Sequence, residues 1–378
     1  MTTRARGRED KAWSQDDGGE TGRSEHPDDA RRWTRREALA LTGVGLASAV
    51  LPLACRHPTE TRRTDDMEAK AMKDDVVDVV VVGGGPAGLN AALNLGRARR
   101  KVLLCDSGPP RNAAAVEVHG FVTRDGIPPK EFRRIAREQL RPYDVEVRDV
   151  RVMGIEREGS GFCVTLEGDR VVVARRVLLA TGMVDVMPDL PGYRELWGKA
   201  IFQCPYCHGW EVRDRPWGVL ATNEMLVDFG IVLTSWSRDM VVFTQGAVTV
   251  SAEKRAQLER AGVRLEERRI RRLVAGSGEH PLEAVELEDG TLIRRDVLFA
   301  RPPQRQVPLV ARLGLATDEQ GYLKVSPQGE TSIPGIYAAG DLTTPMQAAV
   351  MSAAAGALTA GGLNHGLTLE LAGAAHRG

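Results

Sequence analysis

Residues 75–108 read DVVDVVVVGGGPAGLNAALNLGRARRKVLLCDSG, and the order of the patterns within them sets the expected architecture. The β-branched run 76–82 is typical of a strand that is buried on both faces in a parallel sheet. It runs into the glycine-rich segment 83–88, after which the chain is expected to turn into a helix. A second apolar strand, residues 102–105, ends at Asp106. This order of strand, glycine turn, helix, strand and acid predicts a dinucleotide-binding α/β unit.

The glycine-rich segment has the GxGxxG spacing that a pyrophosphate requires. Gly83 permits the tight turn, Gly85 lets the backbone approach the phosphates, and Gly88 lets the helix pack closely on the strand. Pro86 and Ala87 begin the helix, where the missing N–H of proline is not needed. The free N–H groups of this first turn would bind phosphate, and the acid that ends the second strand is placed to accept the ribose hydroxyls. A glycine-rich turn that binds nothing is the alternative.

Length and composition limit the remaining possibilities. With 378 residues, the chain is long enough for two domains. Lys plus Arg and Asp plus Glu both number 51, so the formal net charge of zero gives no electrostatic case for a nucleic-acid partner. The 5 cysteines are scattered apart from one CxxC pair, and they do not make a disulfide scaffold.

The CxxC pair lies in residues 202–211, FQCPYCHGWE, and consists of Cys204 and Cys207. His208 directly follows the second cysteine. The segment alone leaves three interpretations open: half of a zinc site, a structural disulfide or a redox-active dithiol. A zinc site requires two further ligands, and no metal is predicted. The remaining cysteines lie in the leader, in an apolar strand and in a strand-like stretch: Cys55, Cys105 and Cys163. We expect the one in the apolar strand to be a buried core thiol.

The leader predicts export. Residues 1–37 are rich in charged and small residues without apolar periodicity, and are expected to be disordered. Arg35 and Arg36 precede an uncharged stretch, so that residues 35–55 resemble a twin-arginine export signal. This predicts a periplasmic or other extracytoplasmic location, with a lipid anchor at Cys55 left open. The alternatives are an uncleaved membrane anchor, or a start codon placed too early and a cytoplasmic protein.

Two later segments extend the nucleotide-binding pattern. Residues 175–182, RRVLLATG, predict a strand that ends in Ala-Thr-Gly. Residues 331–365, TSIPGIYAAGDLTTPMQAAVMSAAAGALTAGGLNH, predict a strand that ends in Gly-Asp before a helix of small residues. With the glycine loop, these segments resemble the thioredoxin reductase family of two-domain flavoproteins, and the resemblance spans residues 76–365.

The resemblance implies FAD as the cofactor, a homodimer as the usual assembly, and an α/β fold with two Rossmann-like (three-layer ββα) domains. The FAD-binding domain is then discontinuous, 75–187 and 296–370, and residues 188–295 form an inserted CxxC domain of the nicotinamide-binding type. Residues 56–74 read as a linker. The cofactor-binding residues that the motifs and the resemblance assign are Gly83, Gly85, Pro86, Ala87, Gly88, Asp106, Ser107, Arg111, Asn112, His119, Thr181, Gly182, Gly340, Asp341, Gln347 and Ala348.

Within this family, two segments resemble one particular branch. Residues 111–132, RNAAAVEVHGFVTRDGIPPKEF, and the CPYCHGWE run are similar to flavin-dependent dithiol oxidases of the gliotoxin and holomycin type. The resemblance implies that Cys204 and Cys207 are a redox-active pair, with Cys207 nearer the flavin. His208 stands where thioredoxin reductases carry an aspartate that handles protons, a task that histidine can perform near neutral pH. His119 would approach the flavin. A surface or core histidine is the alternative for each.

The inserted domain lacks the glycine fingerprint of a nucleotide site. Where GxGxxA is expected, residues 221–226 read ATNEML. Side chains there would obstruct a pyrophosphate, and Glu224 would repel it. The next strand ends in FTQG, residues 243–246, without an arginine pair for a 2′-phosphate. We predict that this domain keeps its sheet but has lost its nicotinamide ligand, so that NADPH binding is doubtful.

Together, these features predict an FAD-dependent thiol/disulfide oxidoreductase, with a dithiol oxidase favoured. The substrate is expected to be a small-molecule dithiol or a thioredoxin-like protein, and the acceptor oxygen or a quinone. Export agrees with this, because a protein outside the cytoplasm has no NADPH pool. Three alternatives stay open: a thioredoxin-disulfide reductase fed by NADPH or by a protein donor such as ferredoxin, a non-catalytic flavin-bound sensor or scaffold, and a fold whose glycine loops are both vestigial.

Overall fold

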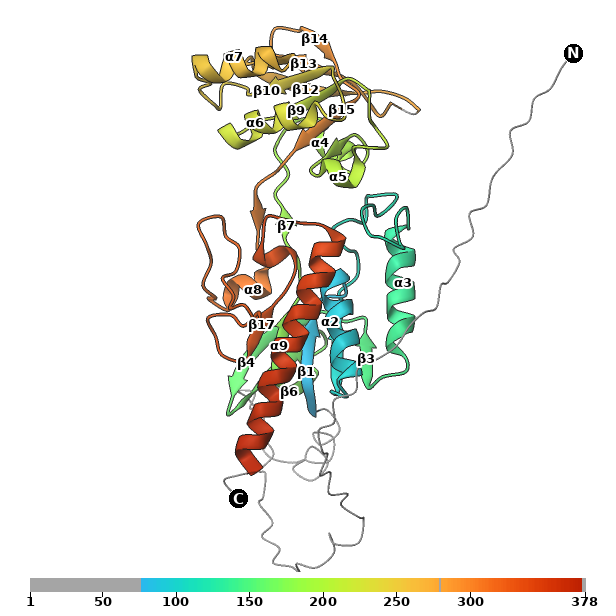
Figure 1. Ribbon diagram of the computed structural model, residues 1–378, viewed down its shortest axis with the longest axis vertical. Helices are drawn as coiled ribbons and strands as arrows, with labels where there is room; N and C mark the ends of the chain where they lie inside the picture. The colour runs from blue at the N-terminus through green and yellow to red at the C-terminus, as the bar shows by residue number, and fades with distance from the viewer. Residues whose placement is uncertain (1–75, 279, 376–378) are drawn as a thin grey trace, which may run out of the picture. The chain divides into compact units, whose positions relative to one another are not determined.

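The computed structural model describes residues 76–278 and 280–375 (Figure 1). The predictions for residues 1–74, namely the disordered region, the export signal with Cys55 and the linker, lie outside these residues. In the described part of the chain, no helix is both long and apolar enough to cross a membrane.

The first sheet is built from both ends of the described chain. Its strands and their helices are β1 (Val76–Val82), α2 (Pro86–Arg97), β2 (Val102–Cys105), α3 (Pro129–Leu140), β3 (Val145–Arg148), β4 (Val152–Glu158), β5 (Gly161–Leu166), β6 (Val171–Leu179), α8 (Pro308–Arg312), β17 (Ile336–Ala338), the short 3-10 helix η1 (Asp341–Thr343) and α9 (Ala349–Ala375). The strand order is β3-β2-β1-β6-β5-β4, and β17 pairs in parallel with the C-terminal half of β6.

The glycine-loop strand β1 lies inside this sheet, between β2 and β6, and it pairs in parallel with both. Val79 and Val81 pack into a core cluster with α2 and α9. Val80 and Val82 pack into the cluster on the opposite face. Because both faces are covered, the strand is a β-branched run that only Asp78 interrupts, and it does not alternate with polar residues. Helix α9 lies in backbone contact with α2, since a Cβ at Gly356 would come within 2.1 Å of the Ala87 carbonyl oxygen.

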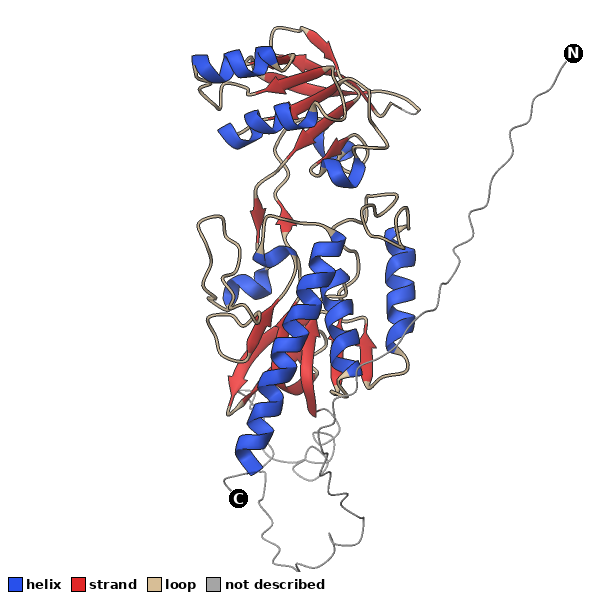
Figure 2. Cartoon of the chain, in the orientation of Figure 1, coloured by secondary structure: helices blue, strands red, loops and turns tan. Residues whose placement is uncertain are grey.

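The second sheet belongs to the inserted domain, whose strands, like those of the first sheet, are flanked by helices (Figure 2). Its elements are α4 (Tyr193–Leu196), β8 (Ile201–Phe202), α5 (Pro205–His208), β9 (Trp217–Leu220), α6 (Glu224–Leu233), β10 (Met240–Phe243), α7 (Ala252–Arg260), β11 (Val263–Glu266), β12 (Ile270–Ala275), β13 (Leu282–Leu287), β14 (Leu292–Arg294) and β15 (Val297–Ala300). The parallel order is β11-β10-β9-β15-β8, and β12-β13-β14 form an antiparallel sheet of their own. The predicted α/β class with two Rossmann-like domains is confirmed.

The second sheet continues past residue 295, where the predicted insert ended. Strand β15 pairs with β8 and β9 of that sheet. The predicted return to the first domain at residue 296 is therefore too early, because a short, fully buried strand carries no signal of the sheet that it joins. The chain enters the insert through β7 (Val184–Asp185) and returns through β16 (Gln304–Arg305), and these two strands pair with each other in antiparallel fashion.

Candidate active site

A cavity of about 630 Å³ opens where β1, β2 and β6 end. Apart from Gly88, every residue predicted to bind the cofactor or to act in catalysis lines it. These residues are Gly83, Gly85, Pro86, Ala87, Asp106, Ser107, Arg111, Asn112, His119, Thr181, Gly182, Cys204, Cys207, His208, Gly340, Asp341, Gln347 and Ala348. The cavity therefore brings together the glycine loop, Asp106 at the end of the second strand and the CxxC turn.

The glycine loop has the geometry of a phosphate cradle. Gly83 has a φ of +116°, and a Cβ there would lie 2.3 Å from the carbonyl oxygen of Ala180. A Cβ at Gly88 would lie 1.9 Å from the Gly83 oxygen, which explains why this glycine serves packing and does not line the cavity. At Gly85, in contrast, nothing in the described part of the chain beyond the two neighbouring residues lies within 4 Å of the Cβ position. No side chain caps the start of α2. This turn thus fits the pyrophosphate of FAD.

Asp106 is held in place by two arginines that sequence reasoning missed. Its carboxylate is buried and accepts hydrogen bonds from Arg133 and Arg137 on α3, the second at 2.6 Å. The other carboxylate oxygen accepts from the backbone N–H of Gly108 at 3.2 Å. Arg133 itself lines the cavity. These guanidinium groups offset the negative charge of Asp106 next to the turn where a pyrophosphate would bind.

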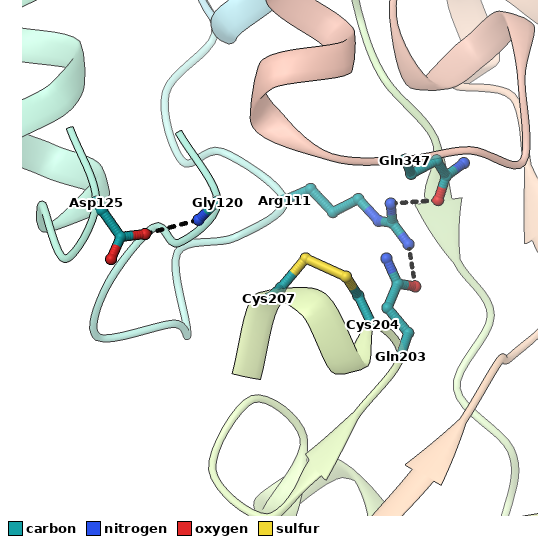
Figure 3. Close-up of a disulfide and its surroundings, with 7 residues drawn as sticks. All are labelled: Arg111, Gly120, Asp125, Gln203, Cys204, Cys207 and Gln347. Carbon is teal, nitrogen blue, oxygen red and sulfur yellow. Dashed lines mark hydrogen bonds between the residues drawn. A yellow bond between two sulfur atoms is a disulfide. The ribbon is translucent and has the colours of Figure 1, made fainter. Parts of the chain in front are cut away.

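Cys204 and Cys207 form a disulfide at the edge of the cavity (Figure 3). Helix α5 begins inside the motif, with Cys204 as its N-cap, and ends after one turn at His208. A single turn carries little of a helix dipole, so it lowers a cysteine pKa only weakly. Among the described residues, no group of three or more His, Cys, Asp or Glu side chains could hold a metal ion.

Cys105, the other cysteine that lines the cavity, is a buried free thiol at the end of β2. Burial raises its pKa to about 12. The prediction of a core thiol is confirmed, and this cysteine stays protonated at neutral pH.

His208 stacks on Phe202, with ring centroids 4.5 Å apart. Both of its ring nitrogens are buried and have no hydrogen-bond partner among the residues that the structure describes. Burial, and to a smaller extent the electrostatic effect of the nearby His119, lower the pKa of His208 to about 4. The pKa of His208 therefore lies well below that of an exposed histidine, because burial disfavours the charged ring. At neutral pH the ring is a neutral imidazole, which can accept a proton but has none to give as an imidazolium.

His119 lies among three carboxylates from separate segments. Its Nε2 is 3.2 Å from Glu117 and 3.5 Å from Glu211, and its Nδ1 is 3.5 Å from Asp125. The carboxylate of Asp125 also accepts from the backbone N–H of Gly120 (Figure 3). His119 was predicted to approach the flavin. It lines the same cavity as the disulfide, and its own nitrogens face acidic groups.

Arg111 is the centre of a polar cluster. It binds Asp185 on β7 through two hydrogen bonds of 2.7 and 2.6 Å, Asp341 at 3.2 Å and Gln347 at 2.6 Å. Although burial opposes it, the hydrogen-bonded carboxylate of Asp185 raises the pKa of Arg111 above its ordinary value. Sequence reasoning missed Asp185 because it belongs to a two-residue strand with no pattern of its own. Gln304 on β16 completes the cluster by donating to Asp185 at 2.8 Å.

The corresponding turn of the inserted domain differs from the glycine loop. Helix α6 begins at Asn223, whose side chain accepts from the backbone N–H of Leu226 at 3.0 Å. The helix thus caps one of its own free donors, and Glu224 stands exposed in the first turn. Both features oppose an anionic ligand at this helix start.

Comparison with known proteins agrees with this geometry. The family described as pyridine nucleotide-disulphide oxidoreductase matches residues 77–356. A probable thioredoxin reductase of Arthroderma benhamiae is 35% identical over 70% of this chain and 73% of its own length. Thioredoxin reductase sirT of Leptosphaeria maculans is 33% identical over 76% of this chain and 94% of its own length. Among solved structures, HlmI is 39% identical, with a TM-score of 0.75 over 80% of this chain and 95% of that chain.

Proposed function

Because the chain belongs to the pyridine nucleotide-disulphide oxidoreductase family, in its thioredoxin reductase-like branch with FAD as cofactor, we propose that it is a dithiol oxidase. In this proposal, a substrate dithiol delivers its electrons through Cys204–Cys207 to FAD, and oxygen or a quinone removes them. The observation that carries the proposal is the second helix start, where Asn223 and Glu224 stand in place of a phosphate-binding turn.

The chain's own residues supply the thiol chemistry. A substrate thiol attacks the Cys204–Cys207 disulfide and forms a mixed disulfide; the second substrate thiol displaces the protein sulfur and leaves as an oxidised, disulfide-containing product. Two protein thiols remain, carrying the two electrons. FAD, when bound, accepts this electron pair as the protein disulfide forms again. His208, directly after Cys207, carries a neutral imidazole that accepts the proton of a reacting thiol, and its low pKa makes it a weak base for this step.

A single comparison of electron sources tests the proposal. The yellow protein is mixed anaerobically with NADPH or with a small dithiol such as dithiothreitol, and the absorbance of oxidised flavin is followed. We expect rapid bleaching by the dithiol and none by NADPH, followed by oxygen uptake when air is admitted. Rapid bleaching by NADPH would contradict the oxidase and favour a reductase.

The second candidate is reduction of a thioredoxin-like protein, with NADPH or a ferredoxin-type protein as the donor. The observation in its favour is that curated relatives at 33 to 35% identity are named thioredoxin reductases. The same flavin-bleaching comparison separates the two functions, because the reductase must accept electrons from NADPH or from reduced ferredoxin.

Replacing His208 with phenylalanine is expected to separate stability from activity. Phenylalanine keeps the stack on Phe202 and removes two buried nitrogens without partners, each of which costs on the order of 1–3 kcal/mol. The melting temperature of the variant should therefore rise. Dithiol-driven bleaching at neutral pH should slow by about tenfold or more, because the base is lost.

The gain in stability should depend on pH. The folded protein binds a proton at His208 only near pH 4, whereas the unfolded chain binds it near 6.5. Below the unfolded pKa, the parent therefore loses stability as the pH falls towards 4, and the variant does not. Thermal melts between these two values measure the difference. Replacement of the exposed, ion-paired His280 is the control, and it should leave the bleaching rate unchanged. If the flavin of His208→Phe bleaches at the parental rate around neutral pH, His208 takes no part in the proton transfer.

A further inference from the structure

Gln203, the residue directly before the disulfide, is hydrogen-bonded to the polar cluster at the flavin cavity. Its side-chain Oε1 accepts from Arg111 Nη2 at 2.7 Å (Figure 3). The other four hydrogen bonds of Arg111 go to Asp185, Asp341 and Gln347. A guanidinium has five N–H donors in one rigid plane, so every donor of Arg111 is engaged. Gln203 is thus bound to a group that its other partners hold fixed.

The CxxC turn itself is a weak support for the disulfide. It is one turn of helix, and no side chain caps its start. Beyond the turn, Glu211 lies 3.5 Å from His119, which is a long contact, and the carboxylate is 38% exposed. Before the turn, the short bond between Gln203 and the charged Arg111 joins two half-buried side chains. A hydrogen bond to a charged group is the stronger of these two restraints.

We propose that Gln203 is a positioning residue: by accepting from Arg111, it holds the Cys204–Cys207 turn against the cavity so that these sulfurs face the flavin. This role rests on the proposed function only in assuming that electrons pass between that disulfide and FAD. Gln203 is expected to affect the transfer of electrons between the sulfurs and the flavin. It is not expected to affect the reduction of the disulfide by a chemical reagent from solution.

The test uses a phosphine reductant on the FAD-loaded, full-length protein without oxygen. The phosphine converts the disulfide to two thiols and becomes a phosphine oxide with an oxygen atom from water. The two thiols then deliver two electrons and their protons to FAD, and the disulfide forms again. Flavin bleaching measures the transfer of electrons from the thiols to FAD. Acid quenching and alkylation, followed by mass spectrometry, measure the formation of the thiols. The Cys207→Ser variant gives the background of direct reaction between phosphine and flavin.

For Gln203→Leu, we expect the thiols to form at the parental rate while flavin bleaching slows on the order of 10- to 100-fold, the range for a lost hydrogen bond to a charged group. Gln203→Glu keeps an oxygen acceptor for Arg111 and should restore bleaching. Gln306→Leu is the matched control: Gln306 is also half-buried, but it donates to the backbone oxygens of Gly321 and Leu342 and does not belong to the Arg111 cluster, so the ratio of the two steps should stay unchanged. FAD content is measured first, and Gln203→Met replaces the leucine variant if that variant loses the cofactor.

The proposal is overturned if Gln203→Leu bleaches at the parental rate, if Gln306→Leu slows bleaching equally, or if the glutamate variant is as slow as the leucine variant. It is also overturned if the parent's flavin does not bleach above the Cys207→Ser background. Failure of the oxidase function looks different: the parent bleaches with phosphine, but small dithiols produce no oxygen uptake.

Discussion

Replacing Cys207 with serine is expected to abolish dithiol-driven reduction of the flavin while leaving FAD bound. Serine cannot form the disulfide, so the electron pair of the substrate has no route through the CxxC turn. We expect the bleaching rate to fall by a factor on the order of 10³ or more, as is usual when a nucleophile is removed. Anaerobic stopped-flow absorbance with dithiothreitol measures this rate.

The matched control is Cys105→Ala. This thiol also lines the cavity, but burial raises its pKa to about 12 and keeps it protonated. Its removal should leave the bleaching rate of the flavin unchanged. If Cys207→Ser bleaches as fast as the parent, dithiols reduce the flavin directly and the disulfide takes no part.

Replacing Gly85 with valine is expected to give a folded protein without FAD. The φ of Gly85 is −82°, which valine adopts readily, and among the described residues only the two chain neighbours come within 4 Å of the new Cβ. The side chain therefore meets only the space where the pyrophosphate would lie. Loss of several charge-assisted hydrogen bonds should weaken FAD binding by about 100-fold or more. Flavin absorbance after gel filtration, together with circular dichroism, measures both outcomes.

Gly88→Val serves as the contrast, because its Cβ would come within 1.9 Å of the Gly83 oxygen and disturb the fold itself. If Gly85→Val retained stoichiometric FAD, the glycine loop would not be the pyrophosphate site.

The first sheet could be predicted from sequence because its signals are local. The β-branched run of β1, the glycine spacing and the acid at Asp106 all lie within one short segment, and the structure places them as expected. The boundary of the insert could not be predicted, because β15 is a four-residue buried strand that would suit either sheet.

The candidate site was predictable where motifs mark it and not where long-range contacts build it. Arg133 and Arg137 lie on a helix whose pattern is that of an ordinary charged surface, yet both bind Asp106. The low pKa of His208 follows from burial against Phe202, which the CxxCH motif does not encode. Asp185 and Gln203 act through Arg111, a partner distant in sequence.

The pairing of β17 with β6 has a consequence for synthesis on the ribosome. Residues 177–179 of β6 cannot complete their hydrogen bonding until residues 336–338 have been synthesised. In the same way, α2 cannot complete its packing until α9 has been made. The inserted domain, whose sheet strands lie between residues 201 and 300, emerges in full during that interval. Since domains tend to fold as units while the chain is made, the insert can reach its native state first, and its paired entry and exit strands then hold the two halves of the FAD domain close together. The segment after residue 300 therefore closes the cofactor domain late, so a ribosome-bound chain that stops short of β17 should not yet retain FAD.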